Sequence, residues 1–202
     1  MENIVCFIDD SAFEHTLVRE EIAPAGRDLL FLQAYTFDEA EAVLNHRMPR
    51  LFLLDLWGAD ETVTAPVVTP KEELEAGIGA IPSLDVVYEG LDKFQGDVTN
   101  EYLKRMFTIV DAWRDLFEEV CTRIGQNRKY GLSNLDRVRA RYPGVPAVFY
   151  TRKSLISDAA ALFRAGADGL YIKPTGADDT ETRRLTRDFA PELIRELRRF
   201  IG

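Results

Sequence analysis

Short runs of consecutive apolar residues alternate along the chain with segments whose apolar residues recur every three to four positions. The runs predict strands buried on both faces of a parallel sheet, at 4–8, 29–32, 50–56, 147–150 and 170–172. The recurring segments predict helices at 11–22, 38–46, 132–142, 154–165 and 179–200. Pro191 predicts a restart within the last helix, because proline fits a first helical turn but not an interior. The alternation predicts an α/β fold with a doubly wound, five-stranded parallel sheet.

The interval between the third and fourth predicted strands is too long for this plan. A connection from strand to helix usually takes ~2–6 residues, so residues 59–130 are expected to be an insertion within a single domain spanning 1–202. Its first half carries Pro66 and Pro70 and is expected to be loop with short pieces of structure. Its second half, about 99–126, predicts a long amphipathic helix. The apolar stripe of that helix packs either on its own domain or against a partner, such as a second copy.

Composition and charge narrow the class of protein. The chain is 46% hydrophobic and 29% charged, as expected for a soluble globular protein. Its net charge of −9, of which −6 falls within 59–130, disfavours nonspecific binding to nucleic acid or to anionic membranes. Cys6 and Cys121 give no disulfide framework, and His15 and His46 give no metal cluster. A cytoplasmic location is therefore expected, with His15 as a solvated surface residue.

Ionisable or hydroxyl side chains stand at the ends of four of the five predicted strands. Asp9 and Asp10 end the first, Asp55 lies in the third, Thr151 ends the fourth and Lys173 ends the fifth. Ligands of open α/β sheets bind beyond the carboxyl ends of the strands, so these side chains are expected to share one site. Three converging carboxylates need a cation, and an all-oxygen ligand set suits Mg²⁺. A lysine and a hydroxyl opposite the metal would cradle a tetrahedral anion, and an aspartate there can become an aspartyl phosphate.

At these residues the sequence resembles the receiver domain of two-component response regulators. The resemblance is carried by FIDDSAFE at 7–14, LFLLDL at 51–56, PAVFYTR at 146–152 and YIKP at 171–174, and it covers the chain except for 59–130. It implies a flavodoxin-like sheet of strand order 2-1-3-4-5, with the insertion as a helical arm.

The resemblance also implies a function. It implies that a histidine kinase or phosphotransfer protein phosphorylates Asp55, that Thr151 follows the phosphoryl group and that Lys173 is its counter-ion. It implies Mg²⁺ as cofactor, with these ligands: Asp9, Asp10, Asp55 and the backbone carbonyl of Trp57. The signal would pass to an output protein by protein–protein contact, and a homodimer could form through the insertion. The chain is not expected to be an enzyme, beyond slow loss of its own phosphoryl group.

Some residues depart from the family's pattern. Leu170 stands where receivers often carry a switch aromatic, and Arg152 follows Thr151 where the family prefers a small residue. Arg152 and the bulky Trp57 are expected to flank the mouth of the site, making a phosphoryl group slow to load and slow to leave. They motivate one alternative, a receiver that is never phosphorylated and acts as a binding module. A second, less favoured alternative is a Mg²⁺-dependent phosphatase of the haloacid-dehalogenase kind. That chemistry usually has a second aspartate two residues after the nucleophile, where this chain has Ser11 or Trp57.

Overall fold

The chain divides into two compact units. The computed structural model describes residues 2–59, 63–152 and 156–202. The first unit, Met1–Asp60 with Asn127–Gly202, is called the sheet unit below, and the second, Glu61–Gln126, is called the helical unit. The sheet unit carries all of the strand-end residues singled out above.

A five-stranded parallel sheet forms the centre of the sheet unit. Its strand order is β2-β1-β3-β6-β7, which confirms the predicted order 2-1-3-4-5. The register pairs Val5 with Leu51 and Leu53 with Val148, so the apolar runs of the central strands lie side by side. The strands are β1 (Asn3–Ile8), β2 (Leu29–Ala34), β3 (Leu51–Leu54), β6 (Ala147–Thr151) and β7 (Gly169–Ile172). A separate two-stranded sheet pairs β4 (Gly58–Ala59) with β5 (Gln126–Asn127).

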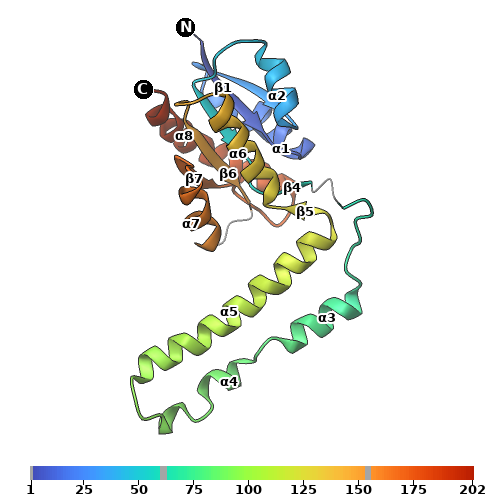
Figure 1. Ribbon diagram of the computed structural model, residues 1–202, viewed down its shortest axis with the longest axis vertical. Coiled ribbons are helices and arrows are strands. Elements are labelled where there is room, and N and C mark those ends of the chain that lie inside the picture. Colours follow the sequence, from blue (N-terminus) through green and yellow to red (C-terminus); the bar gives the residue numbers. More distant parts are fainter. Residues whose placement is uncertain (1, 60–62, 153–155) are drawn as a thin grey trace. The chain divides into compact units, whose positions relative to one another are not determined.

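Helices cover both faces of the five-stranded sheet (Figure 1). On one face the central strands form a core with η1 (Val18–Ile22), a π-helical turn that continues α1 (Ala12–Leu17), and with α8 (Asp179–Ile201). On the other face, α2 (Phe37–Leu44) contacts β1 and α6 (Lys129–Arg141) contacts β3. The prediction of a doubly wound α/β fold is therefore confirmed. Strands covered on both sides are buried on both sides, which explains their continuous apolar runs.

Local signals set the ends of the helices. The Ser11 hydroxyl accepts a hydrogen bond from the Glu14 N–H at 3.4 Å and caps α1, and Thr36 caps α2 by accepting from the Glu39 N–H at 3.2 Å. α2 ends two residues earlier than predicted because Asn45 adopts the left-handed conformation, with φ 44°. The helix predicted at 11–22 is helical from Ala12 to Ile22, but it changes from α1 to the π-helical η1 at Val18 and is followed by a 3-10 turn, η2 (Ala23–Ala25). Of the predicted helix at 154–165, α7 (Ile156–Arg164) is found, and 154–155 lie outside the described residues.

The prediction that Pro191 restarts the last helix is wrong. α8 runs without interruption from Asp179 to Ile201, with Pro191 inside it. An interior proline removes one backbone hydrogen bond and costs about 3 kcal/mol. The side chains on both sides of it are buried in the same core, and their burial outweighs that penalty: Ala190, Leu193, Ile194, Leu197.

Replacing Pro191 with alanine should stabilise the sheet unit. Pro191 is exposed, so the smaller side chain leaves no cavity and restores the backbone donor. The free energy of unfolding in urea should rise by about 2 kcal/mol, the helix penalty of proline less the entropy that proline removes from the unfolded chain. Glu192→Ala, at the exposed neighbouring position, is the control and should change it by less than about 0.5 kcal/mol. An unchanged or lower stability of Pro191→Ala would contradict this account of α8.

The helical unit consists of helices and turns with few buried apolar side chains. Its elements are α3 (Lys71–Ala80), α4 (Leu84–Tyr88), the 3-10 turn η3 (Leu91–Lys93) and α5 (Val98–Arg123). α5 occupies most of the segment predicted as a long amphipathic helix, and the Asp97 carboxylate caps its start by accepting from the Asn100 N–H at 3.0 Å. In the part of the chain that the structure describes, no helix has the length and apolar character to cross a membrane.

Candidate functional site

The predicted site residues meet at one edge of the sheet. Asp9 and Asp10 follow β1, Asp55 follows β3, Lys173 follows β7 and Thr151 is the last residue of β6. Because the strands are parallel, their carboxyl ends share this edge. One carboxylate oxygen from each of the three aspartates lies within 4.8 Å of the other two, and the Thr151 side chain hydrogen-bonds Asp55.

The Lys173 ammonium group lies between two of these carboxylates. Its Nζ donates to Asp9 Oδ2 at 2.5 Å and to Asp55 Oδ1 at 2.9 Å. All three side chains are buried. Charged groups are rarely buried without a partner, so the ion pairs explain how these charges exist inside an apolar sheet. Asp9 is held further by the Ser11 N–H, which donates to Asp9 Oδ1 at 2.9 Å.

Burial and charge shift the acidity of these groups in predictable directions. Burial raises the pKa of Asp9 to about 7, although the Lys173 charge opposes the shift. Burial also raises the pKa of Asp55, against the effects of Lys173 and Thr151. Burial alone would lower the pKa of Lys173, but the Asp55 and Asp9 carboxylates outweigh it and raise that pKa above its usual range. The ammonium therefore stays charged while the carboxylates hold protons more tightly than free aspartates do.

Glu14 on α1 joins the site, which was not predicted. Its buried carboxylate lies 3.6 Å from Lys173 Nζ and accepts a hydrogen bond from Arg152 Nε at 2.7 Å. The signal was present in the motif FIDDSAFE: Glu14 stands one helical turn after Asp10, and a helix that begins beyond Ser11 returns that position to the sheet edge.

Arg152 differs from the expectation that it flanks the phosphoryl position. Besides the bond to Glu14, its Nη1 donates to the Pro174 carbonyl at 2.5 Å and to the Thr175 hydroxyl at 2.9 Å. These contacts direct the guanidinium toward Glu14 and the turn after β7. Arg152 thus neutralises the carboxylate that would otherwise compete for Lys173.

Trp57 also differs from the expectation of a bulky ring at the mouth of the site. Its side chain is only 4% exposed, and the Arg128 guanidinium lies 5.8 Å from its ring centroid. Arg128 in turn pairs with the buried Asp158 carboxylate of α7. The ring is therefore buried beside Arg128, and the Trp57 carbonyl stays a predicted metal ligand.

Tyr130, at the start of α6, is a second neighbour of the acidic cluster that was not predicted. Its hydroxyl donates to the Tyr35 carbonyl at 2.7 Å, and its ring packs so closely on Gly58 that a Cβ there would lie 2.5 Å from it. Burial and the charges of the three clustered aspartates raise the pKa of Tyr130. The next residue, Gly131, allows this approach, because a Cβ on it would lie 2.5 Å from the Asp55 carbonyl oxygen.

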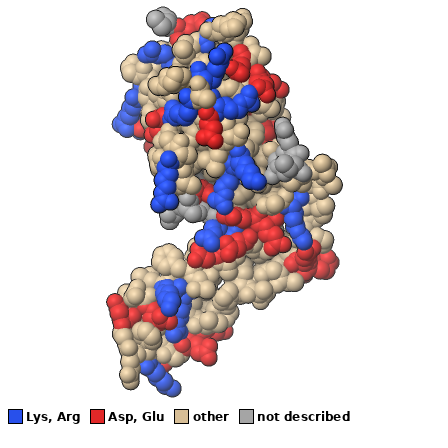
Figure 2. Space-filling model, in the orientation of Figure 1, with Lys and Arg blue, Asp and Glu red and all other residues tan. Residues whose placement is uncertain are grey.

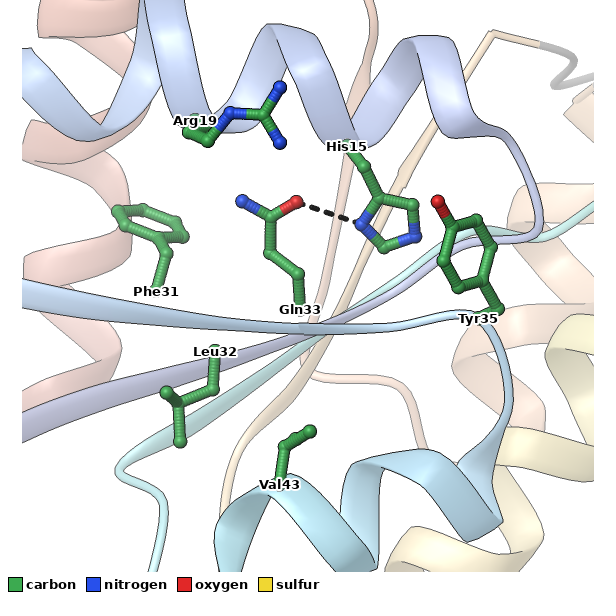
Figure 3. Close-up of a pocket in the computed structure, with 7 residues that line it drawn as sticks. All are labelled: His15, Arg19, Phe31, Leu32, Gln33, Tyr35 and Val43. Carbon is green, nitrogen blue, oxygen red and sulfur yellow. Dashed lines mark hydrogen bonds between the residues drawn. The ribbon is translucent and has the colours of Figure 1, made fainter.

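The expectation that His15 is a solvated surface residue is wrong. Its side chain is 5% exposed, because α1 packs it between the rings of Phe7 and Tyr35. Its Nε2 lies 2.8 Å from the Asp9 carbonyl oxygen. Its Nδ1 lies 2.8 Å from Gln33 Oε1, and Figure 3 marks this hydrogen bond. A surface pocket of about 400 Å³ along the edge strand β2 is lined in part by His15 and Gln33 (Figure 3). His15 thus contacts the backbone carbonyl of Asp9 and helps to hold it in place.

The donor set fits a divalent cation. The carboxylates of Asp9, Asp10 and Asp55 gather at one point, and among the described residues Lys173 pairs with Asp9, Asp55 and Glu14 while Arg152 pairs with Glu14. Asp10 is oriented by the Ala59 N–H, which donates to its Oδ2 at 2.8 Å. Clustered carboxylate oxygens are the ligands that Mg²⁺ prefers. Asp9, Asp10 and Asp55 are therefore the residues that would hold it.

Comparison with known proteins finds likeness at the level of the fold. No protein-family model matches the sequence, and no curated protein matches it. Similar solved structures are response regulators and their receiver domains. A response regulator from Thermotoga maritima is 12% identical, with a TM-score of 0.49, over 100% of this chain and 98% of that one. A CheY-like receiver domain protein from Methanospirillum hungatei JF-1 is 13% identical, with a TM-score of 0.47, over 99% and 97%. NtrX from Brucella abortus is 20% identical, with a TM-score of 0.46, over 98% of this chain, which spans only 29% of NtrX.

The raised pKa of Asp9 predicts a pH-dependent stability of the metal-free protein. The folded state releases the Asp9 proton with a pKa of about 7, whereas the ordinary pKa of an aspartate side chain is 3.8. A raised pKa stabilises the folded state fully below the lower value, and this contribution is lost as the pH rises through the higher one. Asp9→Asn removes the titration. The free energy of unfolding in urea, measured with a chelator present, should therefore fall more steeply from pH 4 to pH 7 for the wild type than for Asp9→Asn. Parallel curves would show that Asp9 titrates normally.

Proposed function

We propose that this chain is a receiver domain that accepts a phosphoryl group on Asp55 and signals by protein–protein contact. One observation carries the proposal: the Lys173 ammonium is shared between Asp9 and Asp55, with the Asp10 carboxylate alongside. A nucleophilic carboxylate, a fixed cation and a group of carboxylate oxygens that can hold a divalent metal ion are the components that phosphoryl transfer to an aspartate needs.

The proposed step forms one bond and breaks one. A carboxylate oxygen of Asp55 bonds to phosphorus while the phosphorus–nitrogen bond of a donor phosphohistidine breaks. The donor imidazole leaves with the bonding electrons and takes up a proton from solvent. Asp55 must be ionised to attack, and the hydrogen bonds from Lys173 and Thr151 oppose the effect of its burial on its pKa. Catalysis here consists of position and fixed charge, without a protein acid or base.

Each neighbour of Asp55 has a role in this scheme. Lys173 would donate to the transferred phosphoryl group in place of Asp55 Oδ1, and the Thr151 hydroxyl would follow the same group. A bound Mg²⁺ would supply positive charge against the equatorial phosphoryl oxygens. Asp9 and Asp10, with the Trp57 carbonyl, would hold the ion beside Asp55.

The partners follow from this chemistry. The donor would be a histidine kinase or a phosphotransfer protein in the cytoplasm, and the phosphorylated chain would contact an output protein. The chain itself would turn over no substrate, apart from slow hydrolysis of its own aspartyl phosphate.

Labelling by a small phosphodonor tests the proposal. Incubation with acetyl phosphate and Mg²⁺ should add one phosphoryl group at Asp55, because Lys173 and Thr151 both hydrogen-bond this carboxylate and are positioned to bind the transferred group. Borohydride trapping and mass spectrometry locate the label. Asp55→Asn should abolish it, and Asp92→Asn, at an exposed acid of the helical unit, should leave it unchanged. Label retained in Asp55→Asn would remove Asp55 from its role.

A second candidate function is supported by the contacts of Arg152. A guanidinium fastened to Glu14 and to the turn after β7 could lock the site in its unphosphorylated form, and the chain would then be a binding module. The two functions differ in what happens when the ion pair is removed. If the chain is a phosphorylated receiver, Arg152 keeps Glu14 from competing for Lys173. If it is a locked module, Arg152 keeps the site in its unphosphorylated form.

The Arg152–Glu14 pair separates these two candidates. If the chain is a phosphorylated receiver, Arg152→Ala should slow labelling by about 10-fold, equivalent to ~1.4 kcal/mol of barrier, because Glu14 then draws Lys173 away. The double variant Arg152→Ala with Glu14→Gln should recover the wild-type rate, since no charge is left to compete. The rates come from a time course of intact mass with acetyl phosphate. A chain that is inert as wild type and labelled as Arg152→Ala would instead establish the locked module.

A further inference from the structure

The edge strand β2 has an open outer side within the sheet unit. Among the described residues, β2 has a neighbouring strand on the side of β1 alone. The backbone groups of successive residues in a strand point alternately to its two sides, and Ala34 points inward, because its carbonyl accepts from the Asp9 N–H at 3.1 Å. Leu32 therefore also faces β1, whereas Phe31 and Gln33 turn their N–H and C=O groups outward.

In the described part of the chain, hydrogen bonds close this outer side at its two ends. At one end the Leu29 N–H donates to the Gly26 carbonyl at 2.8 Å, and at the other the Tyr35 N–H donates to Glu39 Oε2 at 2.8 Å. The two outward residues between these ends form a short stretch of open edge. An open sheet edge offers its donors and acceptors to another strand.

The pocket of about 400 Å³ described above lies along this open stretch, and side chains from both faces of the sheet line it (Figure 3). Phe31 and Gln33 lie on the face that carries α1, together with Arg19 of η1. Leu32 lies on the opposite face, together with Val43 of α2. Successive side chains of an added strand point to alternate faces of the sheet. One side chain of such a strand would therefore meet Arg19, and the next would meet Leu32 and Val43.

The pocket favours an acidic side chain on the face of α1. The Arg19 side chain is 62% exposed, and its Nη2 makes long contacts, at 3.4 Å to Thr16 Oγ1 and at 3.4 Å to Glu20 Oε1. Glu20 is bound more closely by Arg183, which donates to its Oε2 at 2.8 Å. Arg19 therefore keeps donors for a carboxylate in the pocket. Figure 2 shows basic and acidic side chains interspersed over the sheet unit on the face in view, so the local preference for charge is set by single side chains.

The pocket favours an apolar side chain on the face of α2. Val43 is exposed and Leu32 is half-buried, and neither side chain has a polar atom. An apolar side chain placed beside them would remove apolar surface from water. The two faces together select a strand in which acidic and apolar side chains alternate.

We propose that β2 binds an extended segment of a partner protein, with the pattern acidic–apolar–acidic, as an added antiparallel strand. In this arrangement the N–H and C=O groups of Phe31 and Gln33 bond the backbones of the two acidic residues. Four hydrogen bonds then fit within the short open stretch, because each residue of an opposed pair both donates and accepts.

The side chains of the added strand supply the specificity. The two acidic side chains lie on the face of α1, where Arg19 pairs with them, and the apolar side chain between them contacts Leu32 and Val43. Main-chain hydrogen bonds give affinity to complexes of this kind, and pockets for alternate side chains give specificity. The proposal concerns β2 alone and does not depend on phosphorylation of Asp55.

A second copy of the chain is a poorer occupant of this edge. The sequence of β2 is LLFLQA, so a second β2 brings no acidic side chain to Arg19. In an antiparallel pair of identical strands the two-fold axis is perpendicular to the sheet, so α1 of both copies lies on the same face and the two Arg19 side chains approach each other. Charged side chains at a sheet edge keep such copies apart. The edge therefore favours a partner that supplies negative charge.

Amide hydrogen exchange, followed by NMR on the full-length chain, tests the proposal. The probe is the peptide acetyl-TEVET-amide. In the chain alone, the Phe31 and Gln33 amides should exchange much faster than the Leu32 amide, which is bonded to β1. Peptide at about ten times its Kd should slow the exchange of Phe31 and Gln33 about 10-fold, because only the free chain exchanges. The same peptide with both glutamate nitrogens methylated keeps its charge but loses the donors that face β2, and it should give no protection.

Charge reversal tests the role of Arg19. Arg19→Glu should weaken binding of acetyl-TEVET-amide about 5-fold or more, and it should bind acetyl-TKVKT-amide more tightly than the wild type does, because attraction and repulsion are exchanged. Arg195→Glu is the matched control, since the Arg195 side chain on α8 has the same exposure of 62%. This variant should bind both peptides as the wild type does.

Other outcomes overturn the proposal. Unprotected Phe31 and Gln33 amides at millimolar acetyl-TEVET-amide would show that β2 takes no added strand. Equal protection by the methylated peptide would show that binding does not use strand pairing. Protection without peptide that rises with protein concentration would place a second copy at the edge. Slow exchange of both amides at every concentration would show that the chain covers its own edge.

Discussion

The buried ammonium group of Lys173 joins parts of the chain that are far apart in the sequence. It binds Asp9, 164 residues away, and Asp55, 118 residues away, and all three residues follow different strands of one sheet. Either carboxylate alone would be a costly charge in an apolar interior, and together they would repel each other. The cation makes their close approach possible, and the parallel strand order β1-β3-β6-β7 brings the cation to them.

The same edge of the sheet gathers ligands for a divalent cation. Among the described residues, Lys173 pairs with Asp9, Asp55 and Glu14, and Arg152 pairs with Glu14. Burial raises the pKa of Asp9 to about 7, and the oxygens of Asp9, Asp10 and Asp55 lie within 4.8 Å of one another, as the ligands of a hydrated divalent ion do. The proposed function builds on this arrangement, because a phosphoryl group would enter a site that already has a nucleophile, a fixed cation and oxygen ligands for a metal.

The positions of the strands and of the strand-end residues could be predicted from the sequence, because they depend on strand pattern and topology. Continuous apolar runs located the strands, and the rule that parallel strands share a carboxyl edge brought Asp9, Asp55 and Lys173 together. Side chains whose position depends on packing were missed or misjudged. Tyr130 reaches the site only because Gly131 lets α6 approach the end of β3, a fit that no spacing in the sequence reveals. His15 was placed in solvent because its partners are a backbone carbonyl and an amide, which leave no charged motif. Pro191 was expected to break a helix that the burial of its neighbours holds together.

The most direct measurement is the number of protons released when Mg²⁺ binds. Calorimetric titrations in buffers of different ionisation enthalpy measure that number at each pH. The account predicts one Mg²⁺ per chain, with roughly half a proton released near pH 7, where Asp9 is half protonated, and none at pH 9. Asp9→Asn should release none at either pH. Binding without proton release at pH 7, or the same release from Asp9→Asn, would contradict a site in which burial holds a proton on Asp9.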